Sequence, residues 1–141
     1  MSEKIIERKN FLLIQIFRVI LFGFLVWFVP ALVATLFWDV STNKSIIEMI
    51  WFNSLMGFVW SLNFALFAFI YFNGIKKNYS EHGLIAGIIW YIMCVILDFI
   101  VVVLILNLGI IAFLPAVLVY INNFILATMI GYLLNKKNQN E

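Results

Sequence analysis

Three ionisable side chains lie inside or at the edge of long apolar runs of this sequence: Arg18, Glu48 and Asp98. A charged group at the centre of a bilayer costs about 2.5 to 3.5 kcal/mol on insertion scales, so such groups mark positions that need polar contacts or carry chemistry. Glu48 lies close to the start of its apolar run, where a carboxylate can reach water or headgroups. The sequence therefore indicates a polar site at Asp98 first and at Arg18 second.

The side chain of Asp98 is too short to reach the membrane surface, so it must face protein or trapped water. At 100° per residue, a helix places Gly83, Gly87, Tyr91, Cys94 and Asp98 within a stripe about 80° wide. Glycines on such a stripe let another helix approach closely. The sequence therefore predicts that the face with Asp98 points into a helix bundle or an oligomer interface.

Depth in the membrane indicates amide side chains as the neighbours of Asp98. Asn122 and Asn123 lie near the centre of the last apolar run, and Asn53 lies in the outer half of the second run. We predict an intramembrane polar site in which Asp98 is hydrogen-bonded to Asn122 or Asn123, with Tyr91 one or two turns below.

Arg18 lies about 9 Å from the centre of the first apolar run, at 1.5 Å per residue, on the side of the basic N-terminal segment. Its side chain can extend to the membrane interface. The alternative is a partner such as Gln15, Asn63 or an anionic lipid headgroup. We expect a headgroup site or second polar site at these three residues, separate from Asp98.

Two interpretations of the Asp98 site remain open. Buried carboxyl and amide groups can simply hold helices together, at about 0.6 to 2 kcal/mol for each hydrogen bond. A lone protonatable group in the membrane can instead relay protons or cations in a small transporter or channel. The first interpretation is favoured, because the sequence has neither a selectivity-filter loop nor a second acid at matching depth.

The elements that must position these residues are membrane-spanning helices. Of 141 residues, 65% are hydrophobic and 11% are charged, which excludes disordered, disulfide-scaffold and nucleic-acid-binding classes of protein. A helix needs roughly 20 apolar residues to cross a bilayer. We predict an all-α fold, a four-helix transmembrane bundle forming one integral membrane domain over residues 1–141.

Polar and basic segments divide the chain into four predicted spans. Residues 38–45 form a polar loop, residues 74–83 a basic one, and Asn107-Leu108-Gly109 a tight hairpin, because Asn and Gly tolerate left-handed backbone angles. This hairpin places Pro115 in the first turn of the last helix. The spans are predicted at residues 11–37, 46–72, 84–106 and 112–134.

The positive charges are distributed asymmetrically between the two sides of these spans. Lys44 alone lies on one side, and the other side carries Lys4, Arg8, Lys9, Lys76, Lys77, Lys136 and Lys137. Basic loops stay in the cytoplasm, so we expect cytoplasmic N and C termini. We expect the membrane to be the plasma membrane of a prokaryote.

Residues 63–78 match residues 123–138 at seven of sixteen positions. A duplication would make the protein two helical hairpins in parallel orientation. The alternative is that any two helices ending at the cytoplasm combine apolar residues with terminal lysines.

Two stretches carry a resemblance to a known family: Gly23-Phe24-Leu25-Val26-Trp27-Phe28-Val29-Pro30 in the first span, and Gly83-Leu84, Gly87, Trp90 and Leu97-Asp98 in the third. They resemble an uncharacterised family of small four-helix integral membrane proteins of archaea and bacteria. The resemblance implies the four-span fold and no particular activity.

Sequence motifs for catalysis and for cofactors are absent, including phosphate loops, paired metal ligands and nucleophile elbows. We therefore expect a non-enzymatic protein with no catalytic residue, metal or cofactor. Its partners are expected to be the lipid bilayer and either a second copy or another membrane protein, with no nucleic acid. The expected function is an interaction or accessory subunit that associates through polar and small-residue helix faces. The alternative is an oligomeric proton- or cation-linked transporter or channel that uses Asp98.

Overall fold

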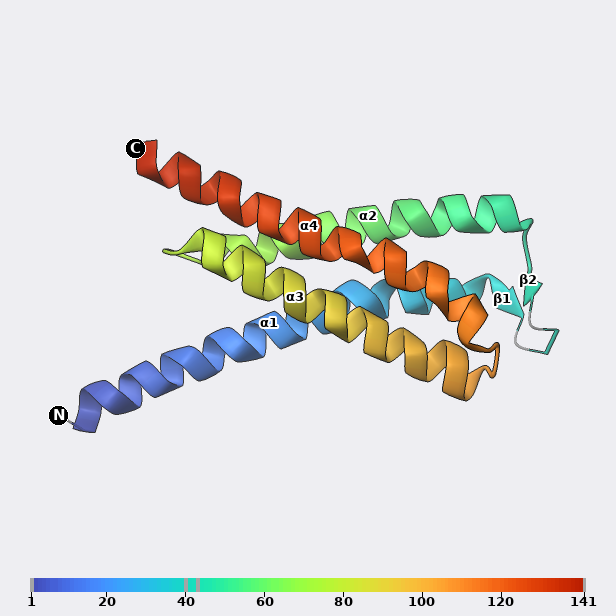
Figure 1. Ribbon diagram of the computed structural model, residues 1–141, viewed down its shortest axis with the longest axis horizontal. Helices are drawn as coiled ribbons and strands as arrows, with labels where there is room; N and C mark the ends of the chain where they lie inside the picture. The colour runs from blue at the N-terminus through green and yellow to red at the C-terminus, as the bar shows by residue number, and fades with distance from the viewer. Residues whose placement is uncertain (1, 40, 43, 141) are drawn as a thin grey trace.

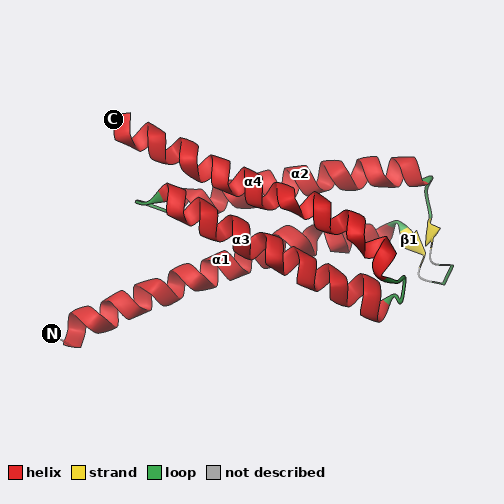
Figure 2. Ribbon diagram, viewed as in Figure 1, coloured by secondary structure: helices red, strands yellow, loops and turns green. Residues whose placement is uncertain are grey.

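A computed structural model describes residues 2–39, 41–42 and 44–140, and the side chains of residues 14–39, 41–42 and 44–139. Apart from short loops and one short antiparallel pair of strands, the described chain is helical (Figure 2). In chain order, the elements are α1 (Ser2–Leu36), β1 (Trp38–Asp39), β2 (Lys44–Ser45), α2 (Met49–Asn73), α3 (Tyr79–Asp98), the π-helix η1 (Phe99–Ile105) and α4 (Ile110–Asn140).

The four long helices run back and forth along one axis (Figure 1). Both chain ends and the α2–α3 loop lie at one end of the bundle, and the strand pair and the α3–α4 turn lie at the other. Candidate membrane spans are Ile14–Leu36, Met49–Asn73, Tyr79–Ile105 and Ile110–Gln139. This confirms the prediction of an all-α bundle with four helices long and apolar enough to cross a membrane.

The outer surface of the bundle is strongly apolar. Phe17, Ile111 and Leu118 have 64%, 82% and 70% of their side chains exposed, and many other large apolar residues are exposed beside them. A soluble monomer rarely carries so large a continuous apolar surface. A lipid bilayer is the environment that fits this apolar surface.

The starts of α2 and α3 differ from the predicted ones. The helix predicted from residue 46 begins at Met49, because the N–H of Ile46 is bonded to the carbonyl of Phe37 at 2.8 Å and continues the strand pair. The helix predicted from residue 84 begins at Tyr79, directly after Asn78 in the left-handed conformation (φ 56°). His82, expected in a loop, therefore lies in the first turn of α3.

The tight α3–α4 hairpin is confirmed. Asn107 and Gly109 have φ angles of 53° and 82°, in the left-handed region that Asn and Gly tolerate best. Helix α4 begins at Ile110, two residues earlier than predicted, so Pro115 lies in its second turn.

Helix α3 is the central element, packed closely against α4 and also against α1. A Cβ atom on Gly83 would lie 2.6 Å from the carbonyl oxygen of Ala127, and one on Gly131 would lie 2.5 Å from that of Tyr79. The two backbones therefore touch at this crossing. This confirms the prediction that the glycines on this face of the third span let another helix approach closely.

The α1–α3 contact is built around Trp90, which is fully buried. Its ring packs edge-on against Tyr71, with ring centroids 5.4 Å apart, and its indole N–H donates to the carbonyl of Val19 at 2.9 Å. A Cβ atom on Gly23 would lie 2.6 Å from the ring. The absence of a side chain at Gly23 thus makes room for Trp90.

Candidate functional site

Asp98 lies at the end of α3 and receives hydrogen bonds from two other helices. The indole N–H of Trp27 on α1 donates to Oδ1 at 2.7 Å, and the hydroxyl of Tyr120 on α4 donates to Oδ2. The carboxyl group is half-buried. One side chain therefore joins three helices, with each oxygen bonded to a neutral donor.

The register of the α3–α4 hairpin explains why Tyr120 reaches Asp98. In an antiparallel hairpin, residues equally far from the turn face each other. Asp98 and Tyr120 are almost equally far from Leu108, as are Cys94 and Asn123, whose side chains are also in contact. The predicted hairpin was sufficient to pair Tyr120 with Asp98 by distance from the turn. The sequence-based prediction used depth in the membrane instead, and depth did not identify Tyr120.

Trp27 reaches Asp98 because α1 and α3 run in the same direction. Trp27 and Asp98 are 71 residues apart in sequence, and so are Val19 and Trp90. Two contacts with the same separation show a common register along parallel helices. Sequence reasoning missed Trp27 because nothing in the sequence states that the first and third spans are neighbours.

The amide partners expected for Asp98 do not bind it. Asn123 is fully buried, its Nδ2 donates to the sulfur of Cys94 at 3.4 Å, and its Oδ1 has no hydrogen-bond partner in the described part of the chain. Asn122 is adjacent on α4 and its side chain points outward, and Asn53 is exposed on α2. Tyr91 is half-buried about two turns from Asp98. The structure thus places Asp98 with aromatic donors instead of amides.

The backbone changes from α- to π-helix directly after Asp98, at η1. The last turn is closed by a hydrogen bond from the N–H of Leu106 to the carbonyl of Val101, five residues earlier, at 2.8 Å. Such widened turns are rare and are often found at functional sites. Because the helix begins at Tyr79, Asp98 lies about 9 Å from the midpoint of the span Tyr79–Ile105, toward the end with the strand pair.

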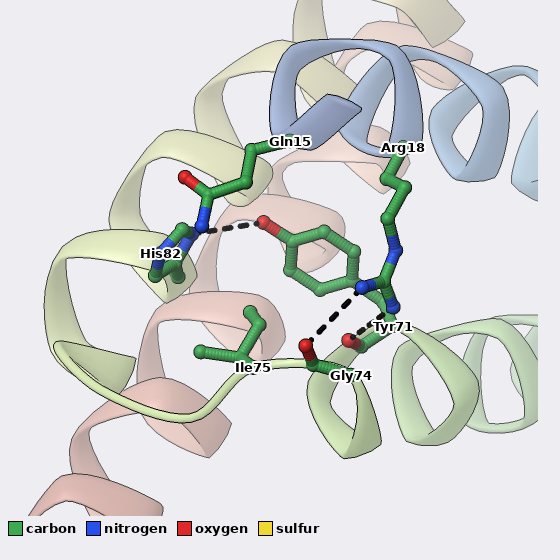
Figure 3. A pocket seen from close by; sticks show the side chains of 6 residues that line it. All are labelled: Gln15, Arg18, Tyr71, Gly74, Ile75 and His82. Atoms are coloured by element: carbon green, nitrogen blue, oxygen red, sulfur yellow. Dashed lines mark hydrogen bonds between the residues drawn. The ribbon is translucent and has the colours of Figure 1, made fainter. Parts of the chain in front are cut away.

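A second polar cluster surrounds Arg18 at the opposite end of the bundle. Its guanidinium donates to the carbonyl oxygens of Gly74 at 3.2 Å and Tyr71 at 3.3 Å. These carbonyls belong to the end of α2, where the helix dipole is negative. The carbonyl of Tyr71 also accepts from the N–H of Gly74 at 3.2 Å. The hydroxyl of Tyr71 lies 3.4 Å from Nδ1 of His82 (Figure 3).

Of the residues predicted to join Arg18, one does so and one does not. Gln15 lines the same small pocket. Asn63 is buried near the middle of α2, about 16 Å from Gly74 at helical rise. Its Nδ2 donates to the carbonyl of Val26 at 2.9 Å. Asn63 thus links α2 to α1. The sequence did not indicate that Tyr71 and His82 are neighbours of Arg18.

The remaining chemistry of the described residues is limited. No three His, Cys, Asp or Glu side chains within the described ranges lie close enough together to hold a metal ion. Asp39, at the end of β1, accepts hydrogen bonds from the hydroxyls of Ser41 and Thr42 at 2.6 and 2.8 Å. These bonds hold the pKa of Asp39 below its usual value of 3.8.

Comparisons with known protein families, with curated proteins and with solved structures found no match to this chain. No family is therefore identified, and the resemblance noted from the sequence extends only to the number of spans. The identification depends on the fold: four long apolar helices, packed as a bundle with an apolar outer surface, characterise a small four-helix membrane protein.

Proposed function

We propose that this protein is a non-enzymatic membrane protein that associates with other transmembrane helices as an interaction or accessory subunit. The observation that carries the proposal is the α2 face, defined as Ser54, Gly57 and Ser61. All three residues are exposed, and a Cβ atom on Gly57 would meet nothing within 4 Å. Small residues on an open helix face allow a second helix to approach closely.

The polar groups of the α2 face favour a helix as the partner. The hydroxyls of Ser54 and Ser61 donate to carbonyls of their own helix, those of Ile50 and Gly57, each at 2.8 Å. They can therefore be covered by another helix without losing a hydrogen bond. Asn53, beside this face, is exposed, and its amide would gain a partner from an approaching helix.

The charge distribution supports an orientation for the bundle. Both chain ends and the α2–α3 loop lie at one end (Figure 1), and the loop lysines Lys76 and Lys77 are exposed there. Lys44 is at the opposite end. We propose that the end with the termini is cytoplasmic, in the plasma membrane of a prokaryote.

Cysteine cross-linking in native membranes tests the α2 face. In a Cys94→Ala background, Gly57→Cys is expected to form a cross-linked dimer, or an adduct with another membrane protein, at least about tenfold more efficiently than Leu62→Cys. Leu62 is a matched control, because it is 61% exposed on the same helix but points in another direction. Equal cross-linking at both positions would refute the proposal, and a dimer would identify a second copy as the partner.

A second function is favoured by one observation at Asp98. A carboxyl group held by two neutral donors, immediately before a π-helix, is compatible with a proton- or cation-linked transporter or channel. Purified protein in liposomes should then conduct protons or cations, and Asp98→Asn should reduce the flux at least about tenfold. Absence of flux from the wild-type protein would remove this function and leave the interaction subunit.

A further inference from the structure

We infer that the pocket around Arg18 binds the phosphate group of an anionic membrane lipid. The pocket lies where α1, the end of α2 and the start of α3 meet, and is lined by Gln15, Arg18, Tyr71, Gly74, Ile75 and His82 (Figure 3). A guanidinium, an amide and an imidazole are brought together in it. Each of these groups can donate a hydrogen bond to a phosphate oxygen.

Arg18 has both charge and donors available for such a ligand. A guanidinium has five N–H donors, and the described contacts of Arg18 are with two neutral carbonyls, those of Tyr71 and Gly74. Within the described part of the chain, no carboxylate lies at ion-pair distance from Arg18. Its positive charge is therefore not neutralised, and a planar guanidinium suits a phosphate especially well.

Glycine at position 74 is what lets the guanidinium occupy this place. A Cβ atom there would collide with the guanidinium carbon and both terminal nitrogens of Arg18. Gly74 has φ −90° and ψ 0°, a conformation open to other residues, so the constraint is space and not backbone angle. The side chain of Arg18 is thus held in position over the end of α2 before any ligand binds.

The depth of the pocket favours a lipid over a free phosphate ion. The span of α2 ends at Asn73, so the guanidinium lies at the membrane boundary, where lipid phosphates are found. Deeper in the membrane on α1, Ile20 and Leu21 are 47% and 39% exposed, and can contact the acyl chains of the same lipid. Basic pockets between transmembrane helices on the cytoplasmic side are known to hold such headgroups.

The charges around the pocket favour an anion. Lys76 and Lys77 are exposed in the adjoining loop, and Glu81 is exposed on the first turn of α3. Together with Arg18, these residues give this corner of the bundle a net positive charge. Anionic lipids are therefore attracted to it in preference to zwitterionic lipids.

Lipid retention measured by native mass spectrometry tests the site. The full chain is released from nanodiscs of phosphatidylcholine with a minor fraction of phosphatidylglycerol, and retained lipids are counted. The wild-type protein is expected to retain one phosphatidylglycerol in preference to phosphatidylcholine, and Arg18→Gln to lower this preference about tenfold. Lys76→Gln, which removes the same charge outside the pocket, should change it less than about twofold. Equal losses in both variants would overturn the proposal.

A second variant tests the position of the guanidinium without changing any charge. Gly74→Ala keeps every charge and displaces the guanidinium, so it should lower the preference as Arg18→Gln does; an unchanged preference would overturn the proposal. Inorganic phosphate added to phosphatidylcholine nanodiscs provides the last comparison. We expect no saturable, Arg18-dependent binding by phosphorus NMR, and such binding would overturn the lipid assignment. None of these variants touches the α2 face, so this test is independent of the proposed function.

Discussion

Removing the hydroxyl of Tyr120 tests whether Asp98 joins the helices of the bundle. Tyr120→Phe keeps the ring that fills the space between α3 and α4 and removes the donor to Oδ2 of Asp98. Interhelical hydrogen bonds in membrane proteins average about 0.6 kcal/mol and reach about 1.7 kcal/mol. Because the acceptor is a carboxyl group, we expect a loss in the upper part of this range, about 1 to 1.7 kcal/mol.

The assay is reversible unfolding in mixed micelles with increasing dodecyl sulfate, followed by helical circular dichroism. Tyr132→Phe is the matched control, because Tyr132 lies on the same helix with 59% of its side chain exposed. Its substitution is expected to change the free energy of unfolding by less than about 0.5 kcal/mol. The difference between the two variants isolates the contribution of the buried hydroxyl.

A double-mutant cycle completes this test. In an Asp98→Ala background the acceptor is gone, so Tyr120→Phe should no longer be destabilising, giving a coupling energy of about 1 kcal/mol. An equal cost of Tyr120→Phe in both backgrounds would refute a stabilising bond between Tyr120 and Asp98. Equal effects of Tyr120→Phe and Tyr132→Phe would refute it as well.

Four further predictions can be checked with the same protein. Gly83→Ala should cost about 1 to 3 kcal/mol of unfolding free energy, because its methyl group meets the backbone of α4, whereas Gly57→Ala should cost nothing measurable in monomeric protein. Asn63→Ala should lose about 1 kcal/mol, since its amide bonds to α1, and the same change at exposed Asn122 should be neutral; equal losses would count against the assigned burial. Because hydrogen bonds depress the folded-state pKa of Asp39, their contribution to stability is present above pH 3.8 and lost as pH falls through the folded value; NMR titration of Ser41→Ala should show this pKa moved upward. A reporter fused to the C-terminus should be protected from external protease in intact cells, and cleavage there would refute the orientation.

The sequence identified several elements of the fold from local chemistry alone. Apolar runs long enough to cross a bilayer predict helices wherever the backbone must satisfy its own hydrogen bonds. The hairpin at Asn107 and Gly109 was predicted because left-handed angles favour these residue types, and both adopt them. That the face with Gly83 points into a helix contact was predicted from the spacing of glycines, and the structure shows that the neighbour is α4.

Helix boundaries were less accurate because they depend on neighbouring elements. The start of α2 was shifted by a strand hydrogen bond from Ile46 to Phe37, which no apolar pattern records. Polar residues after Asn78 suggested a longer loop, but α3 begins at Tyr79 and brings His82 against Tyr71. Polar residues are common both in loops and in the first turn of a helix, so residue type alone did not show that the helix begins at Tyr79.

The sequence by itself determined that Asp98 and Arg18 need partners, because the bilayer makes isolated charges costly whatever the fold. Only the tertiary structure decided which partners they have. Trp27 reaches Asp98 because α1 and α3 are parallel and in register, and Arg18 reaches Gly74 because α1 crosses the end of α2. The free-energy cost of burying each polar group can be inferred from the sequence. The hydrogen bonds that offset this cost depend on which helices are neighbours, and that is decided by packing over the whole bundle.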